Sequence, residues 1–94
     1  MESTVALIEK EDVSSLIFPS TPVHLTEAEH KILLSQLERA NTLGNIEHHK
    51  VHIYFEDSVG LKRVHTTVWA FTDKSVLLKK NVQIPIHRII KLDI

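Results

Sequence analysis

The chain has 94 residues, which is enough for one domain with a single modest core but too few for a deep cleft between domains. Hydrophobic residues make up 43% and charged residues 24%, a balance that is typical of a soluble globular protein and argues against disorder. No apolar run approaches the ~20 residues of a bilayer crossing, and the acidic N-terminus is unlike a secretory signal. Because there is no cysteine, disulfides, thiol nucleophiles and zinc–thiolate sites are excluded. We therefore expect a cytoplasmic protein without a membrane segment.

The net charge of −1 conceals an asymmetry between the two halves of the chain. Residues 1–45 contain three basic and seven acidic side chains, whereas residues 46–94 contain eight basic and five acidic ones. This modest excess of positive charge in the second half fits a solvated surface better than a phosphate-binding surface, which requires clustered Lys and Arg.

The first 25 residues are weakly patterned and are expected to form an N-terminal arm that is partly extended. Pro19 and Pro22 separate this arm from the rest of the chain. Two short apolar stretches, Val5–Ile8 and Leu16–Phe18, are apolar enough to dock as extended pieces. Residues 26–94 are expected to form a single domain.

Thr26 and Glu29 form the sequence pattern of a capping box, in which each side chain accepts a hydrogen bond from the backbone N–H of the other. Apolar residues then recur at the three-to-four-residue spacing of one helical face: Ile32, Leu33, Leu37 and Ala40. Gly44 suits a left-handed C-terminal cap. The pattern predicts a helix over residues 27–42.

In the second half of the chain the apolar residues recur at a spacing of two, which is typical of strands with one buried face. Residues 51–56 and 63–68 are expected to pair in an antiparallel hairpin closed by a tight turn. The predicted register places three pairs on the buried face: Phe55 with Val64, Ile53 with Thr66, and Val51 with Val68. It also places Glu56 opposite Arg63, a favourable charge pair.

Three further strands follow, separated by turn-forming residues. They are predicted at Val76–Lys79, Val82–Ile86 and Arg88–Ile94. Pro85 restricts its strand to an edge or ends it in a short turn. We expect a mainly β fold with one N-terminal helix: a small, strongly bent, five-stranded antiparallel meander that curls into a barrel, with the helix against one opening.

This order of elements resembles the Sm-like small β-barrels, including their Rof-type bacterial variants, which place an N-terminal helix before five highly bent strands with a short helical turn between the last two. Here Thr26–Gly44 corresponds to the helix and Ile84–Ile90 to the turn that leads into the last strand. The glycine usual in the second strand of these proteins is absent from Val64–Phe71, and their RNA-binding Asn has no assigned counterpart. The resemblance is therefore carried to the architecture, since a fold does not by itself give a function.

The outward face of the predicted hairpin combines aromatic and cationic residues, which are common both at protein interfaces and in single-stranded nucleic-acid sites. The candidate binding surface consists of Lys50, His52, Tyr54, Arg63, His65, Trp69, Phe71 and Lys79. Alternatively, Trp69 and Phe71 have a structural role and pack under the helix or the N-terminal arm.

Seven histidines are many for this length, and His48, His49 and His52 are close in sequence. Four residues of a strand span about 13 Å, which is too far for His48 and His52 to share one metal ion. His52 and His65 are expected to lie near each other across the hairpin, but no carboxylate triad or cysteine completes a metal site. We expect neither a metal nor another cofactor.

The sequence contains no catalytic signature. It has neither a nucleophile-elbow motif nor paired carboxylates, and its two glycines are too few for a backbone phosphate loop. The sequence therefore predicts a non-enzymatic binding module. Its partner is expected to be another protein or a second copy of the chain, with RNA or another single-stranded nucleic acid as the alternative.

Overall fold

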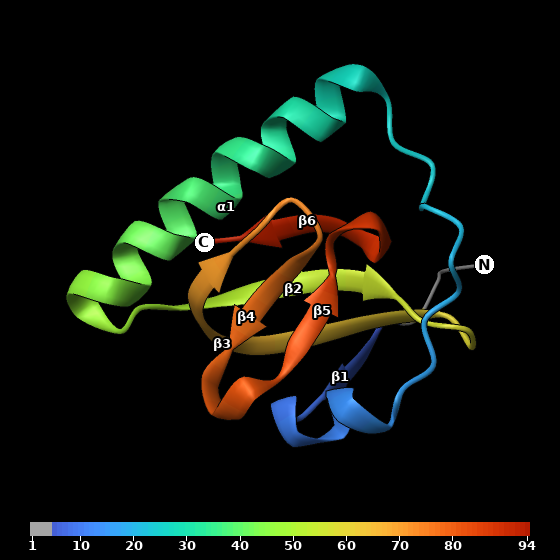
Figure 1. Ribbon diagram of the computed structural model, residues 1–94, viewed down its shortest axis with the longest axis horizontal. Coiled ribbons are helices and arrows are strands. Elements are labelled where there is room, and N and C mark those ends of the chain that lie inside the picture. Colours follow the sequence, from blue (N-terminus) through green and yellow to red (C-terminus); the bar gives the residue numbers. More distant parts are fainter. Residues whose placement is uncertain (1–4) are drawn as a thin grey trace.

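The computed structural model describes the backbone of residues 5–94 and all of their side chains except that of Asn81. The protein consists of one long helix, α1 (Glu27–Glu47), packed against a six-stranded sheet (Figure 1). The strands are β1 (Ala6–Ile8), β2 (Lys50–Glu56), β3 (Leu61–Phe71), β4 (Ser75–Leu78), β5 (Gln83–Pro85) and β6 (Ile89–Asp93). Three short 3-10 helices are η1 (Lys10–Ser15), η2 (Lys79–Asn81) and η3 (Ile86–Arg88). Among the described residues, none of these helices combines the length and apolar character that a membrane crossing needs.

Five strands form the path β5-β4-β3-β2-β6, in which all neighbours are antiparallel. The predicted helix followed by five antiparallel strands is thus confirmed. The meander extends only from β2 to β5, because β6 pairs with β2 at the opposite end of the path instead of with β5. The structure adds a sixth strand, β1, which pairs in parallel with β3. The predicted closure into a barrel is wrong, because no ladder joins β5 to β6 within residues 5–94.

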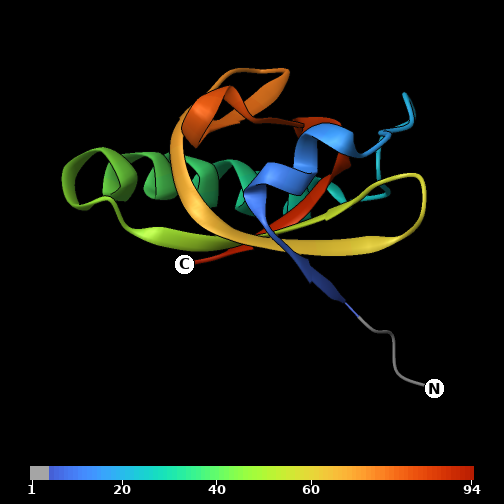
Figure 2. The same ribbon diagram turned by 90° about the horizontal axis from the view of Figure 1, so that it is seen from below.

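Strand β3 is bent and divides its pairing between two neighbours (Figure 2). Its first part, up to Thr67, pairs with β2, and its last part, from Val68, pairs with β4. The ladder with β4 shifts register between Val68 and Ala70, a β-bulge that increases the local bend. The last part of β3 is therefore left without β2 along one edge.

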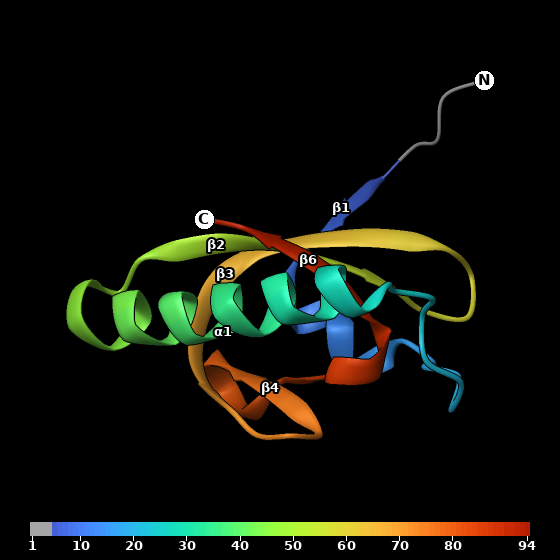
Figure 3. The ribbon, with the colours of Figure 1, turned by 90° about the horizontal axis from the view of Figure 1, so that it is seen from above.

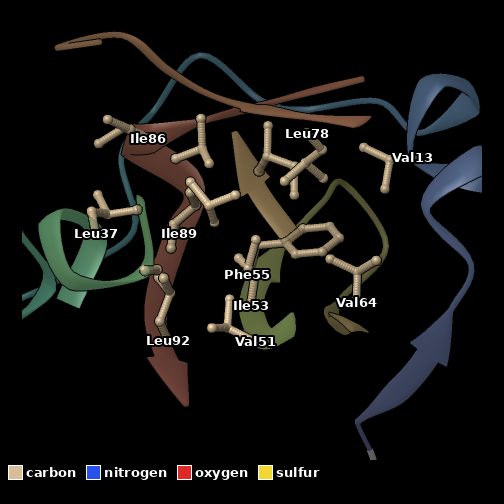
Figure 4. Packing of buried hydrophobic residues seen from close by; sticks show 14 of the residues in the cluster. Val13, Leu37, Val51, Ile53, Phe55, Val64, Leu78, Ile86, Ile89 and Leu92 are labelled. Carbon is tan, nitrogen blue, oxygen red and sulfur yellow. The ribbon is translucent and has the colours of Figure 1, made fainter. Parts of the chain in front are cut away.

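The apolar core lies inside this bent sheet (Figure 4). Its largest fully buried members include Phe55, Leu33, Leu37, Ile53, Leu78, Ile84, Ile89 and Leu92. Along β2 the buried residues alternate with half-buried ones, which confirms the predicted inner face of that strand. Val13 of η1 is also fully buried, so the segment before α1 contributes to the core.

The register of the β2–β3 hairpin differs from the predicted one by two residues. The observed pairs are Phe55 with Lys62, Ile53 with Val64, and Val51 with Thr66. A two-residue shift keeps every side chain on its predicted face, so the inner residues of β3 are buried as expected. The predicted Glu56–Arg63 pair is wrong: Glu56 lies opposite Leu61, and its carboxylate is 3.7 Å from the Arg88 guanidinium.

The loop Asp57–Gly60 explains this shift. Asp57 Oδ1 accepts hydrogen bonds from the backbone N–H groups of Val59 and Gly60, each at 2.9 Å. It also accepts one from Lys62 Nζ at 3.1 Å, in an ion pair whose Asp57 side chain is only 1% exposed. These contacts need a four-residue loop, which is longer than the tight turn expected from the sequence.

Helix α1 is longer than predicted and ends at Glu47 instead of residue 42. The predicted capping box is confirmed, with Thr26 Oγ1 accepting the Glu29 N–H at 3.1 Å and Glu29 Oε1 accepting the Thr26 N–H at 2.8 Å. The C-terminal cap is His48, whose backbone is left-handed with φ 55°. The assignment of Gly44 as the cap is therefore wrong.

Gly44 is required for packing instead. A Cβ atom at this position would collide with the Val68 carbonyl oxygen and would lie 3.0 Å from Thr67 Cγ2. The missing side chain lets α1 approach the backbone of β3 at the point where β3 changes partners.

Helix α1 lies along the open side of the sheet and contacts mainly β3 and β6 (Figure 3). Two of its side-chain amides bond to strand backbone. Gln36 Oε1 accepts the Leu92 N–H at 3.1 Å, and Asn45 Nδ2 donates to the Trp69 carbonyl at 3.3 Å. The helix thereby satisfies backbone groups that face it rather than another strand.

The segment before α1 is tied to the sheet by hydrogen bonds. Residues 5–25 contain β1, η1 and an extended stretch. In that stretch the Val23 N–H donates to the His87 carbonyl at 2.8 Å, and the Arg88 guanidinium donates to the Thr21 carbonyl at 2.6 Å. The first four residues of the predicted arm lie outside the described residues.

We expect Gly44→Ala to destabilise the protein, although alanine favours a helix over glycine by about 1 kcal/mol. The added methyl group would collide with the Val68 carbonyl, and overpacking of this kind costs about 1–3 kcal/mol. Urea denaturation gives the free energy of unfolding. Gly60→Ala is the control, because no atom lies within 4 Å of a Cβ at that position. A stabilised Gly44→Ala variant would contradict the close packing of α1 on β3.

We expect Asp57→Asn to lower the free energy of unfolding by about 1–3 kcal/mol at neutral pH, because Lys62 loses its charged partner. Burial alone would raise the pKa of Asp57, but hydrogen bonds from Gly60, Lys62 and Val59 outweigh burial and hold that pKa below its usual 3.8. The carboxylate therefore stabilises the fold above about pH 4, and this contribution is lost as the pH falls through the lower pKa of the folded state.

Urea denaturation of wild type and Asp57→Asn at several pH values measures this contribution. The difference between their free energies of unfolding should shrink as the pH falls below about 4. Asp73→Asn, in an exposed turn, is the matched control. Equal unfolding midpoints for wild type and Asp57→Asn at neutral pH would show that the ion pair contributes nothing.

Candidate functional site

A row of four side chains crosses the outer face of the sheet, which is the face turned away from the core. Strand pairing aligns Leu7 of β1 with Arg63 of β3, Arg63 with Tyr54 of β2, and Tyr54 with Lys91 of β6. Leu7 is 58% exposed and Lys91 is exposed, whereas Tyr54 and Arg63 are half-buried. We refer to these four residues as the aromatic–cationic row.

Tyr54 interacts with the cations on both sides of it. Lys91 Nζ lies 4.8 Å from the centre of the Tyr54 ring and the guanidinium carbon of Arg63 lies 5.9 Å from it, distances within the cation–π range. An Arg63 N–H also approaches the Tyr54 hydroxyl at 3.5 Å. Arg63 Nε is buried and has no hydrogen-bond partner among residues 5–94. The guanidinium therefore keeps donor capacity that the described residues do not use.

His52 and His65 lie next to this row, directly opposite each other in the β2–β3 ladder. Their rings stack, with centroids 4.1 Å apart and planes inclined by 11°. Stacked rings direct their nitrogen lone pairs along parallel planes, whereas two ligands of one metal ion must converge on a point. In the part of the chain that the structure describes, no group of three His, Cys, Asp or Glu side chains is placed to hold a metal ion.

The outer face carries more positive than negative charge. Its cations are Lys50, Arg63 and Lys91. Asp93 lies opposite His52 at the margin of the face. Glu56, at the end of β2, is engaged by Arg88 at 3.7 Å. An anionic group that approaches this face therefore meets a net positive charge around Tyr54.

This charge affects the protonation of His65, whose pKa is lowered from its ordinary value of 6.5. Partial desolvation of the ring is the largest cause, followed by electrostatic repulsion from His52, Lys50 and Arg63. A proton on His65 would add charge to a surface that is already positive. His65 is therefore neutral near neutral pH.

Trp69 does not belong to the aromatic–cationic row. It lies in the last part of β3, where its ring centroid is 5.4 Å from that of His48 at the end of α1. Its side chain is half-buried, and its Nε1 atom is buried without a partner among the described residues. A small hollow of about 230 Å³ beside it is bordered by Lys79.

Phe71 faces the core rather than the outer face. The β-bulge between Val68 and Ala70 reverses the alternation, so Phe71 lies opposite the fully buried Val76. Phe71 is partly buried against the hydrophobic core. This position agrees with the structural alternative for Phe71 and not with an outward aromatic residue.

The predicted surface is thus divided into three parts. Lys50, His52, Tyr54, Arg63 and His65 share the outer face, Trp69 and Lys79 lie together beyond the bend in β3, and Phe71 turns inward. Leu7 and Lys91 were not identified from the sequence. The alternation of Lys91 with the apolar Leu92 was a usable signal, whereas nothing in residues 5–8 identifies β3 as the partner of β1.

A larger groove lies away from the outer face, near the start of α1. Its volume is about 860 Å³, and its walls are the segment before α1, the β3–β4 turn and η3. Leu33 and Ile86 belong to its apolar lining, while Glu27, Asp73 and Lys74 are its charged residues. These mixed charges do not select one class of ligand, and none of the predicted surface residues lines the groove.

No protein-family model matches the chain, and no curated protein or solved structure matches it significantly.

We expect the stability of the protein to fall as the pH drops below about 6.5, and His65→Gln to weaken this dependence. Because the pKa of His65 is lower in the folded protein, the unfolded chain binds a proton more readily. The stabilisation is complete above the unfolded-state pKa and declines below it, until the pH passes the folded-state pKa. Urea midpoints between about pH 5 and pH 7.5 measure the effect. His24→Gln, at an exposed position, is the control; identical profiles for wild type and His65→Gln would contradict the expectation.

Proposed function

We propose that this protein is a non-enzymatic protein-interaction module that works in the cytoplasm and binds an acidic surface of its partner through the outer face. The observation that carries the proposal is the aromatic–cationic row, in which Arg63 and Lys91 flank Tyr54 on the face opposite the core.

The residue types on this face support protein recognition. Tyr and Arg are enriched at the energetically important positions of protein interfaces, and the exposed Leu7 adds apolar area at the end of the row. The Arg63 guanidinium makes only a long contact with the Tyr54 hydroxyl, at 3.5 Å, and a guanidinium forms its strongest hydrogen bonds with carboxylates. A partner that presents Asp or Glu side chains therefore supplies the acceptors that this face lacks.

The distribution of charge over the molecule supports the same partner. Helix α1 contains more acidic than basic residues: Glu27, Glu29, Glu38 and Glu47 against Lys31 and Arg39. An acidic partner is therefore repelled by the helix and attracted by the outer face. Such complementarity raises the rate of association and fixes the orientation of the complex.

RNA or another single-stranded nucleic acid is the second candidate, because cations and an aromatic ring share the outer face. Stacking of a base requires an accessible ring face. The Tyr54 ring already interacts with Arg63 and Lys91, and Trp69 lies beyond the bend in β3. These positions favour an acidic protein over a nucleic acid.

We also propose that the domain is related in architecture to the Sm-like barrels. The support is the order of its elements, since α1 precedes the five strands β2 to β6 and η3 lies between the last two. The added strand β1 and the open sheet distinguish this chain from the closed five-stranded form.

We expect a fluorescently labelled polyglutamate peptide to bind the full chain with an affinity that falls as the salt concentration rises. Arg63→Glu should weaken binding by about tenfold or more, because it reverses the charge beside Tyr54. Fluorescence anisotropy at two salt concentrations measures both effects. Arg39→Glu is the matched control, since it makes the same change of net charge on the exposed side of α1.

Two further measurements decide between the candidate partners. Single-stranded RNA of mixed sequence that binds more tightly than the peptide, and that loses affinity in Tyr54→Ala, would favour nucleic acid. A dimer in sedimentation that excludes the peptide would favour self-association. Equal peptide binding by Arg63→Glu and Arg39→Glu would show that the outer face is not the binding surface.

A further inference from the structure

Most edges of the sheet are covered by other parts of the chain. Gln36 accepts the Leu92 N–H at the edge of β6, and Asn45 donates to the Trp69 carbonyl at an edge of β3. At the other end of the sheet, η1 contacts β5. Strand β1 differs from these, because β3 pairs with one of its edges and no strand among residues 5–94 pairs with the other.

Strand β1 has only three residues, and shortness is one protection of an edge strand, but β1 lacks two of the other protections against pairing with other chains. The stretch Val5–Ile8 contains neither a charged residue nor a proline. Ala6 and Leu7 are exposed. Figures 2 and 3 show β1 at the margin of the sheet, with its beginning directed away from the body of the domain. The free edge is therefore accessible and carries neither a charge nor a proline.

We propose that the free edge of β1 accepts an extended acidic segment of the partner protein as an additional strand of the sheet. The inference rests on the proposed function and adds the mode of binding to it. Backbone hydrogen bonds to β1 provide affinity, and side chains that reach the aromatic–cationic row provide specificity, as in other cases of strand addition.

Strand geometry defines the side-chain pattern of this segment. An added strand lies about 4.8 Å from β1 and about 10 Å from β3. Its outward side chains extend the aromatic–cationic row, where a Glu carboxylate can reach the long Arg63 side chain past Leu7. Its inward side chains lie beside Ala6 and Ile8, and Ile8 packs against the core. A segment that alternates acidic and apolar residues fits both sides.

A second copy of the chain and an RNA strand fit this edge less well. The β1 strand of a second copy has no acidic residue within Val5–Ile8 and would bring a second Arg63 toward the first. RNA has no peptide N–H and C=O groups with which to continue a β-ladder. An acidic, extended protein segment is the occupant that both the charge of the face and the backbone of the edge favour.

Two synthetic peptides of roughly eight residues, the length of an ordinary strand, test the proposal. One alternates Glu with Val. The other keeps every Glu but replaces two central Val residues by Pro, so it retains its charge and loses N–H groups that a ladder needs. NMR titration of the isotope-labelled full chain gives the affinities and the hydrogen-exchange rates of the backbone amides. We expect the alternating peptide to bind at least about tenfold more tightly and to slow exchange within Val5–Ile8.

The outcomes separate this inference from the proposed function. Equal affinities for the two peptides, without slower exchange in β1, would overturn strand addition and leave the acidic-partner function in place. Binding of neither peptide would overturn both. Arg63→Glu should weaken binding of the alternating peptide, whereas Arg39→Glu should not. If the β1 amides of Arg63→Glu still exchange slowly once the peptide saturates the protein, strand addition is supported even though the affinity is lower. A dimer without peptide, with its β1 amides already protected, would assign the edge to a second copy and overturn the proposal.

Discussion

The contact between Gly44 and the backbone of Val68 is the constraint on which the rest of the fold depends. Strand β3 leaves β2 after Thr67 and joins β4 at Val68, so the sheet opens along one side at this point. Helix α1 can enter the opening only because Gly44 has no side chain to meet the Val68 carbonyl. Once the helix is there, the Gln36 and Asn45 amides reach the backbone on its two sides. One close contact therefore replaces the strand pairing that a closed barrel would use.

Closure by a helix also separates the parts of the sheet that stabilise the fold from those that remain free to bind. Along β2, Ile53 and Phe55 are buried in the core, while His52 and Tyr54 between and beside them point to the opposite face. The core already includes residues from α1 and η1, so the outer face contributes little to the buried apolar area. Polar and aromatic residues can therefore occupy that face at little cost to stability, since its side chains keep part of their contact with water.

The sequence predicted those parts of the architecture that follow from the spacing of apolar residues or from a local motif. Alternation along β2 and β3 identified the buried face, and the capping box identified the start of α1 at Thr26. Alternation could not distinguish registers that differ by two residues, because both bury the same side chains. The hydrogen bonds of Asp57 within its loop select the observed register. For a related reason the sequence could not show that Phe71 points inward, since a bulge inserts one residue without any change of composition.

The candidate site, like the fold, could be predicted from the sequence only in part. Five residues of the predicted surface share the outer face because they lie on one hairpin, whose side-chain directions follow from the alternation. Leu7 joins them through a parallel pairing with a strand far away in the sequence, and a three-residue strand is too short to show a period. Gly44 was predicted as a helix cap although it serves close packing, because a glycine near a helix end fits both a cap and a close approach.

The long sequence separation of these pairings also bears on the order in which the molecule assembles. The β2–β3 hairpin is local and can form within microseconds, whereas the bond between Gln36 and Leu92 spans 56 residues and must await loop closure. Strand β1 is likewise distant from β3, has only three residues and keeps Leu7 largely in solvent. We therefore expect β1 to detach in small native-state fluctuations that leave the core intact. On this expectation, the edge of the sheet should open and re-form independently of the core during the lifetime of the folded domain.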